Sequence, residues 1–131
     1  MRTIRFFGAS TVLLAATLMI GCTAEVFPVS GPVGIDWCRL DPETGGLLVE
    51  VRNNGPAEAV ASTTRVDFLG FGASDLSVPA IPAGTSTMVG PATFPSLCFN
   101  PDCNFRIMVD FFNQIQETDE TNNIVDGYCL G

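Results

Sequence analysis

The residues best suited to chemistry in this chain are oxygen-bearing side chains gathered between positions 110 and 123. A hard cation such as calcium takes about six to eight oxygen ligands, so this run could hold one. It lacks the glycine of an EF-hand loop, and Asp and Asn at a chain reversal also bond neighbouring backbone N–H groups. We therefore expect a structural corner and no cofactor. Calcium bound by the first five of these residues, or contact with a partner, is the alternative. The run consists of Asp110, Asn113, Glu117, Asp119, Glu120, Asn122 and Asn123.

The remaining composition gives little support to catalysis. The chain has no His and, by inspection, no Lys, so it lacks the commonest general base and the Schiff-base nucleophile. Asp119 and Glu120 are neighbours and point to opposite sides of an extended segment, whereas paired-carboxylate catalysis needs two carboxyls facing each other across a cleft. Fourteen acidic residues and a net charge of −8 do not suit a nucleic-acid partner. We expect neither an enzyme nor a nucleic-acid binder.

The N-terminal segment has the pattern of an export signal. Arg2 and Arg5 precede an uncharged run over residues 6–20. A membrane-spanning helix needs about 20 apolar residues, so this run is short for a span and suits a signal peptide. Whether this segment is cleaved or stays as an uncleaved membrane anchor, the domain lies outside the cytoplasm, where thiols oxidise.

The end of this run gives Cys22 a chemistry of its own. The sequence Leu18-Met19-Ile20-Gly21-Cys22 resembles a bacterial lipobox. The resemblance implies cleavage after residue 21 and a lipid on the sulfur of Cys22, which would anchor the protein in a membrane. Thr23 after the cysteine favours the outer membrane or cell surface. Ordinary cleavage near Ala24, giving a secreted or periplasmic protein, is the alternative.

The chain after Cys22 divides into a short connection and one folded domain. Residues 22–34 are rich in turn formers, among them Pro28, Gly31 and Pro32, and predict a tether. Residues 35–131 are long enough for one domain with a modest core.

The sequence pattern predicts that β-strands position the candidate site residues. Apolar residues alternate with polar ones in the segment 46–53, where Leu47, Val49 and Val51 share a face. Turn signals such as Asn54-Gly55-Pro56 separate the alternating segments. This spacing predicts an all-β, antiparallel sandwich of about seven strands. The other expected strands are 64–69 and 105–111, the weaker 33–40 and 124–130, and the short 76–78 and 85–89.

Three segments carry a resemblance to a known family. The stretch 46–55 followed by 57–61, the stretch 78–86, and the acidic run from Val109 to Asn123 are similar to the bacterial cell-adhesion-related domain, CARDB. The resemblance covers roughly residues 35–130. It implies an immunoglobulin-like β-sandwich of bacterial and archaeal surface proteins. The segment 95–104, with two cysteines, departs from the family pattern.

With Cys22 acylated, four cysteines remain, and they allow three pairings. Cys98 and Cys103 flank a Pro-containing turn that can bring them within bridging distance. In immunoglobulin-like sandwiches the first strand can run beside the last, which would join Cys38 to Cys129. The rival pairing, Cys103–Cys129 with Cys38–Cys98, stays open because folding the last hairpin about Gln116 puts Cys103 level with Cys129.

Five aromatic residues could form contact surfaces. Trp37 shares an expected face with Ile35, which favours packing against the core over an exposed platform. Tyr128 lies on the last expected strand. Three phenylalanines near strand ends serve either as a contact patch or as lids on the sandwich, and they are Phe71, Phe99 and Phe112.

Together these observations predict a non-catalytic, lipid-anchored binding or adhesion module of the cell envelope. Its expected partners are the membrane, through Cys22, and an envelope protein or a polysaccharide. The alternatives are a structural accessory subunit with a purely protein interface and, less favoured, a calcium-dependent recognition domain.

Overall fold

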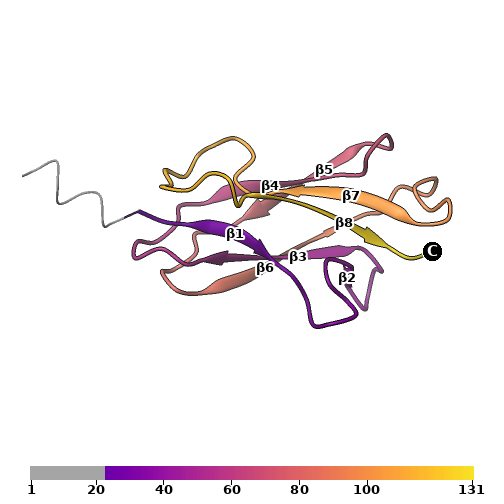
Figure 1. The fold of residues 1–131 in the computed structure, drawn as a ribbon, viewed down its shortest axis with the longest axis horizontal. Coiled ribbons are helices and arrows are strands. Elements are labelled where there is room, and N and C mark those ends of the chain that lie inside the picture. Colours follow the sequence, from indigo (N-terminus) through magenta and orange to yellow (C-terminus); the bar gives the residue numbers. More distant parts are fainter. Residues whose placement is uncertain (1–22) are drawn as a thin grey trace, which may run out of the picture.

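The computed structural model describes residues 23–131, and within them the chain forms strands and turns but no helix. Two antiparallel sheets pack face to face (Figure 1), which confirms the predicted immunoglobulin-like sandwich. No helix in this part of the chain could cross a membrane. The strands are β1 (Val26–Val29), β2 (Arg39–Leu40), β3 (Leu47–Asn53), β4 (Ser62–Asp67), β5 (Ala73–Val78), β6 (Ser86–Ala92), β7 (Cys103–Met108) and β8 (Ile124–Cys129).

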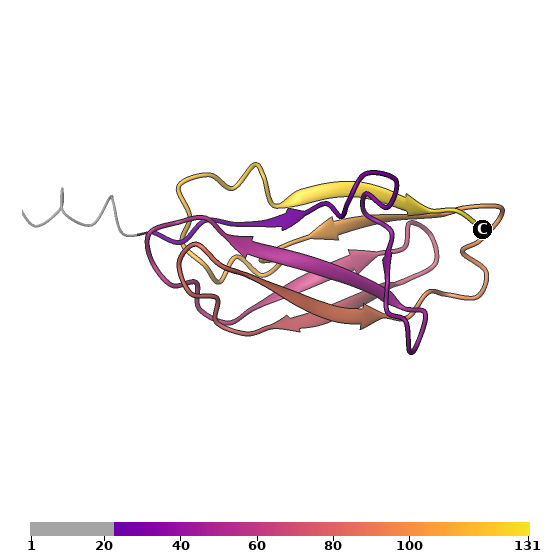
Figure 2. The same cartoon turned by 90° about the horizontal axis from the view of Figure 1, so that it is seen from below.

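Each sheet has four strands. In the first, β3 is the centre: β1 pairs with its second half, β2 pairs with its beginning, and β6 pairs along most of its length. The second sheet has the order β5-β4-β7-β8. Figures 1 and 2 both show β1 running alongside β8 in the same direction. The first and last parts of the described chain therefore meet at one edge of the sandwich.

The core follows from the alternation in the sequence. Leu47, Val49 and Val51 of β3 are buried, and the residues between them are partly exposed. Phe105 and Ile107 of β7 face them from the second sheet with at most 1% of their surface exposed. Burial of each such side chain contributes about 1.5–3 kcal/mol, so the alternation fixes which face of each strand turns inward.

The predicted tether over residues 22–34 is wrong for residues 24–29, which belong to the folded domain. Ala24 is 5% exposed and Val26 is 1% exposed, and β1 pairs in register with β3 from Val26 opposite Asn53 to Val29 opposite Glu50. Pro28 is tolerated because β1 is short and lies at the edge of its sheet. The signal peptide 1–21 and Cys22 lie outside the described residues.

Two other expected strands have different limits. The segment 33–40 is mostly a turn, with β2 restricted to Arg39–Leu40. The segment 105–111 leaves the sheet after Met108, because Asp110 has a positive φ of 50° that a strand cannot accommodate. Expectations based on alternation therefore fail where backbone conformation, and not side-chain polarity, ends the strand.

The loops gather at the two ends of the sandwich. We call them the N-terminal end, where β1 starts, and the C-terminal end, where Gly131 lies. The N-terminal end holds the start of β1 and the loops 54–61, 79–85 and 109–123. The C-terminal end holds Gly131 and the loops 41–46, 68–72 and 93–102 (Figure 1).

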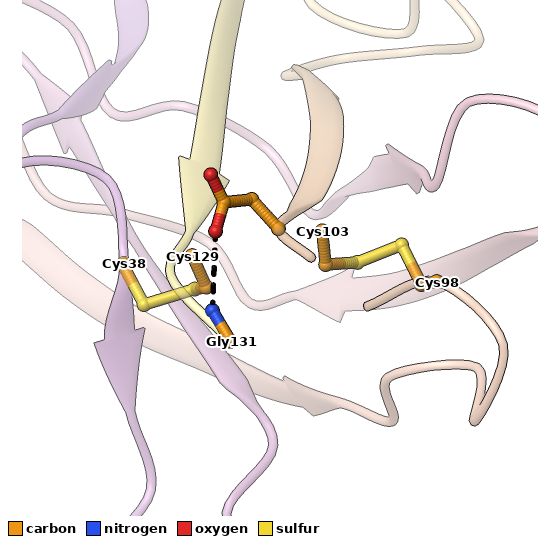
Figure 3. Close-up of a disulfide and its surroundings, with 6 residues drawn as sticks. Cys38, Cys98, Cys103, Cys129 and Gly131 are labelled. Carbon is orange, nitrogen blue, oxygen red and sulfur yellow. Dashed lines mark hydrogen bonds between the residues drawn. A yellow bond between two sulfur atoms is a disulfide. The ribbon is translucent and has the colours of Figure 1, made fainter. Parts of the chain in front are cut away.

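Two disulfides lie toward the C-terminal end (Figure 3). Cys38 pairs with Cys129 and Cys98 with Cys103, with Cα–Cα distances of 5.1 and 4.9 Å. This is the pairing favoured from the sequence, but Cys38 lies between the turn 33–37 and β2 and not late in the first strand. Cys103 does stand opposite Cys129 in the β7–β8 ladder, as the rival pairing assumed.

Candidate functional site

The acidic run forms the loop between β7 and β8 at the N-terminal end. Asp110 begins this loop with only 5% of its surface exposed. Its carboxylate accepts the backbone N–H groups of Gln114 at 2.8 Å and of Ile115 at 3.1 Å. Asp visits the left-handed region more readily than most residues, and two N–H donors replace ladder bonds that the turn lacks. Asp110 therefore organises the turn.

Glu117 ties this loop to the first strand. Its Oε2 accepts the backbone N–H of Val26 at 3.0 Å, and its Oε1 accepts the side-chain amide of Asn123 at 3.0 Å. In return, the carboxylate of Glu25 accepts both the backbone N–H and the hydroxyl of Thr118. We call these reciprocal bonds, between Glu25–Val26 and Glu117–Thr118, the β1 clamp. They join parts of the chain more than 90 positions apart.

The clamp contains a carboxyl group that titrates near neutrality. Burial raises the pKa of Glu117 to about 7, because the charged form loses hydration. The hydrogen bonds from Asn123 and Val26 lower the pKa, and the nearby charges of Glu120 and Asp110 raise it further. The charge inside the clamp therefore changes between mildly acidic and mildly alkaline solution.

The other members of the run bond within the loop. Asp119 accepts the backbone N–H of Thr121 at 2.9 Å and its hydroxyl at 2.5 Å, and these bonds lower the pKa of Asp119. The Asn113 amide, with its nitrogen toward Glu120, donates to both carboxylate oxygens at 3.0 and 3.2 Å. Asn122 is exposed.

These bonds bear on the calcium alternative. Each of the five candidate ligands, Asp110, Asn113, Glu117, Asp119 and Glu120, bonds a group of the protein. Among residues 23–131 there is no group of three or more His, Cys, Asp or Glu placed to hold a metal ion. The geometry of this loop supports a structural corner that holds β1 in place.

A different cluster forms toward the C-terminal end, where the chain brings its single Trp and single Tyr together. The Cys38–Cys129 disulfide fixes the segment 34–38 against β8. A Cβ on Gly127 would lie 2.6 Å from the Cβ of Trp37 and 2.8 Å from the ring of Phe105. Only a glycine in β8 lets Trp37 approach this closely, because any larger residue would push the segment away.

Trp37 and Tyr128 line an open groove of about 380 Å³, which we call the aromatic groove. Tyr128 is 56% exposed, whereas Trp37 is partly buried and packs against the core. We expected Trp37 and Ile35 to share a face that packs against the core. For Ile35 this expectation is wrong, because its side chain is 45% exposed. The groove lies within the usual size of small-ligand sites. Its side-chain lining is Ile35, Asp36, Trp37, Cys38, Asp126, Tyr128 and Leu130.

The two carboxylates of the aromatic groove differ in their surroundings. Asp126 accepts from the guanidinium of Arg106 at 2.7 and 3.2 Å, and this hydrogen bonding lowers the pKa of Asp126. Asp36 is exposed on a turn with a φ of 47°. In the described part of the chain no ion pair involves Asp36. The groove therefore carries one negative charge that the surrounding chain does not neutralise.

The three phenylalanines flagged from the sequence lie in two places. Phe71 and Phe99 are at the C-terminal end, 46% and 37% exposed, and the ring of Phe99 is tilted against that of Phe94 with the centroids 5.2 Å apart. Phe71 also lines a second groove of about 350 Å³, between Leu69 and the disulfide loop 98–103. Phe112 lies at the N-terminal end and is 57% exposed. Phe99 thus both covers the core and reaches the surface.

Sequence reasoning missed three residues of these sites. Glu25 fell within the expected tether, so its clamp with Thr118 had no signal. Asp36 stood in an expected strand. Gly127 did carry a signal, since a glycine inside a strand marks the close approach of another chain segment.

The CARDB family model matches residues 40–126, which is more than half of the chain. No curated protein matches, and neither does any solved structure.

Proposed function

Because the chain belongs to the CARDB family, we propose that it is a non-catalytic, lipid-anchored binding module of the cell envelope. The family consists of adhesion-related, immunoglobulin-like domains of exported bacterial proteins. The lipid on Cys22, the surface location and an envelope protein or polysaccharide as partner are the parts of this proposal that go beyond the family.

The observation that carries the proposal is the separation of the chain entry from the aromatic groove and the second groove. Ala24 is already buried, so only Thr23 stands between Cys22 and the core. A lipid on Cys22 would hold the N-terminal end of the sandwich against the membrane. The aromatic groove and the second groove, near the opposite end, would then point away from it.

The anchor is tested with Cys22→Ser. We expect the unmodified chain in the membrane fraction, because lipoproteins carry two or more acyl chains and bind firmly. The variant should appear in the soluble exported fraction. Membrane retention of the variant at unchanged molecular weight would contradict the lipid anchor.

The alternative function, a structural accessory subunit with a purely protein interface, is favoured by one feature. The C-terminal end exposes Leu97 and Leu130 by about three quarters of their surface, at 76% and 75%. Apolar exposure of this kind is typical of protein contacts. Cross-linking in intact cells separates the two functions. A single stoichiometric protein partner supports the accessory subunit, and attachment to polysaccharide or to other cells supports the adhesion module.

A further inference from the structure

The aromatic groove offers acceptors and ring faces but few donors. Its charged lining consists of carboxylates, which accept hydrogen bonds only, and no Asn, Gln or Arg lines it. The indole and the phenol present apolar faces that attract cations. A ligand that complements this lining is rich in N–H donors, positively charged and flat enough to lie against a ring.

The molecule contains an arrangement of this kind within its own structure. The guanidinium of Arg65 lies 3.9 Å from the centroid of the Phe111 ring and binds Asp75 through two bonds of 2.6 and 2.8 Å. A guanidinium both stacks on rings and binds carboxylates in pairs. The aromatic groove repeats the ring and the carboxylate with Trp37, Tyr128 and Asp36, but without a cation that neutralises Asp36.

The groove is also held ready for a ligand. The disulfide Cys38–Cys129 and the close contact at Gly127 fix one wall against the other. A preformed site loses less entropy on binding than one that must be ordered. Most of its lining lies outside residues 40–126, the span that matches the family model. The family match therefore assigns no role to most of the residues that line the groove.

We infer that the aromatic groove binds an arginine side chain presented by a segment of another protein. The inference rests on the proposed binding function and names the chemistry of its ligand. Asp36 would pair with the guanidinium, and the rings of Trp37 and Tyr128 would cover its faces.

A second copy of this chain fits poorly as the partner, because its described arginines are already engaged. Three of them bind carboxylates, at Glu50, Asp75 and Asp126, and the fourth donates to the carbonyl of Gly84. The chain has no Lys. Residues 23–131 of a second copy therefore offer no unengaged arginine, which favours a different protein as the source of the cation.

The test uses the full chain released from the membrane by Cys22→Ser, with Trp37 as the reporter. Trp37 is the only tryptophan, so its fluorescence reports on the groove directly. The probes are the acetylated and amidated peptides GRGRG, GKGKG and GEGEG, and a neutral oligosaccharide, chitohexaose. We expect GRGRG to change the fluorescence and to bind more tightly than GKGKG, and we expect no response to GEGEG or chitohexaose.

Matched variants separate the groove from general attraction to an acidic protein. Asp36→Asn removes the charge and keeps a residue that tolerates a positive φ, and Tyr128→Ala removes an exposed ring. Each should weaken GRGRG binding by about two- to fivefold, and the two together by about tenfold. Glu58→Gln, an exposed acid at the N-terminal end, should leave binding unchanged.

Three results would overturn the inference: an equal loss of GRGRG binding with Glu58→Gln, binding of chitohexaose in place of GRGRG, or no binding of any peptide. Circular dichroism of each variant verifies the fold. If the protein with an intact groove binds no peptide but membrane attachment and adhesion are seen in cells, the arginine site alone is refuted. Failure of Cys22→Ser to release the chain would refute the anchor alone.

Discussion

The two ends of the sandwich both carry acidic residues, but they hold themselves together by different means. At the N-terminal end the carboxylates of Glu25, Asp110 and Glu117 bind N–H and hydroxyl groups of the chain itself. Toward the C-terminal end two disulfides hold the structure, and Asp36 has no ion-pair partner within residues 23–131. An acidic residue therefore points to a ligand only where the chain leaves its charge uncompensated.

The largest expected effect on stability comes from removing a disulfide toward the C-terminal end. Replacing Cys38 and Cys129 together by Ala opens a ring of about 92 residues, and the chain-entropy estimate for such a ring is about 4 to 5 kcal/mol. The matched pair Cys98→Ala with Cys103→Ala opens a ring of six residues, worth about 2 kcal/mol. Urea unfolding should therefore show a clearly larger loss for the first pair. Equal losses would mean that both bonds act mainly through local packing.

The disulfides also show how far the sequence could lead. The even number of cysteines and the turn at Pro101 were enough to favour Cys98–Cys103. Cys38–Cys129 followed from a correct view of the sandwich edge, although Cys38 follows a turn and is not itself in a strand. Cys103 and Cys129 are ladder neighbours, so register alone could not exclude their pairing. Only the position of the segment 34–38 beside β8 decides it.

The same reasoning explains the misplaced tether. Turn-forming residues around Pro28 hid a strand of four residues, too short to show alternation on its own. Its stability comes from distant partners: the β3 ladder on one side and Glu117 on the other. Such long-range contacts leave no local pattern, whereas the long strand β3 carried its own alternation and was predicted to within one residue. The alternation of β7 predicted a strand but not its limits.

The second prediction removes the charge of Asp110, the most buried of the carboxylates that hold the N-terminal end together. Asp110→Asn keeps a residue suited to the left-handed backbone. It leaves a neutral amide oxygen for one of the N–H groups of Gln114 and Ile115, and turns an amide NH2, which is a donor, toward the other. We expect a loss of about 1–3 kcal/mol in the free energy of unfolding. Asp119→Asn makes the same chemical change at an exposed position, where we expect a few tenths of a kcal/mol. Similar losses would show that burial at Asp110 does not matter.

A smaller effect concerns the pH dependence of the β1 clamp. The pKa of Glu117 in the folded chain is about 7, above its ordinary value of 4.5, so folding favours the protonated form. The stabilisation is complete below pH 4.5 and is lost as the pH rises through 7. The full shift would correspond to about 3 kcal/mol, and partial exposure of the carboxyl reduces this to about 1 kcal/mol.

Unfolding free energies at pH 5 and pH 8 measure this effect. The unmodified chain should lose about 1 kcal/mol more than Glu117→Gln across this interval. The acids with lowered pKa values, Asp75, Asp119 and Asp126, titrate below this window and do not contribute. Glu43→Gln, an exposed acid at the other end, serves as the control and should follow the unmodified chain. An identical pH dependence in Glu117→Gln would place the titrating group elsewhere.

The smallest expected effect tests whether the carboxylates of the N-terminal end bond only the chain itself or bind a metal ion. If the carboxylates of the N-terminal end are satisfied by the chain, adding EDTA or calcium should leave the melting temperature unchanged in calorimetry. Calcium bound at a hundred times its dissociation constant would add about 2.7 kcal/mol, and a domain of this size shifts by about 4–8 °C per kcal/mol. A shift of this size that disappears in Glu120→Gln would assign a metal to the corner, because Glu120 bonds only the Asn113 amide within its loop and its loss disturbs the β1 clamp least. Both ends would then bind a ligand through acidic residues, a metal ion at the N-terminal end and an arginine side chain toward the C-terminal end.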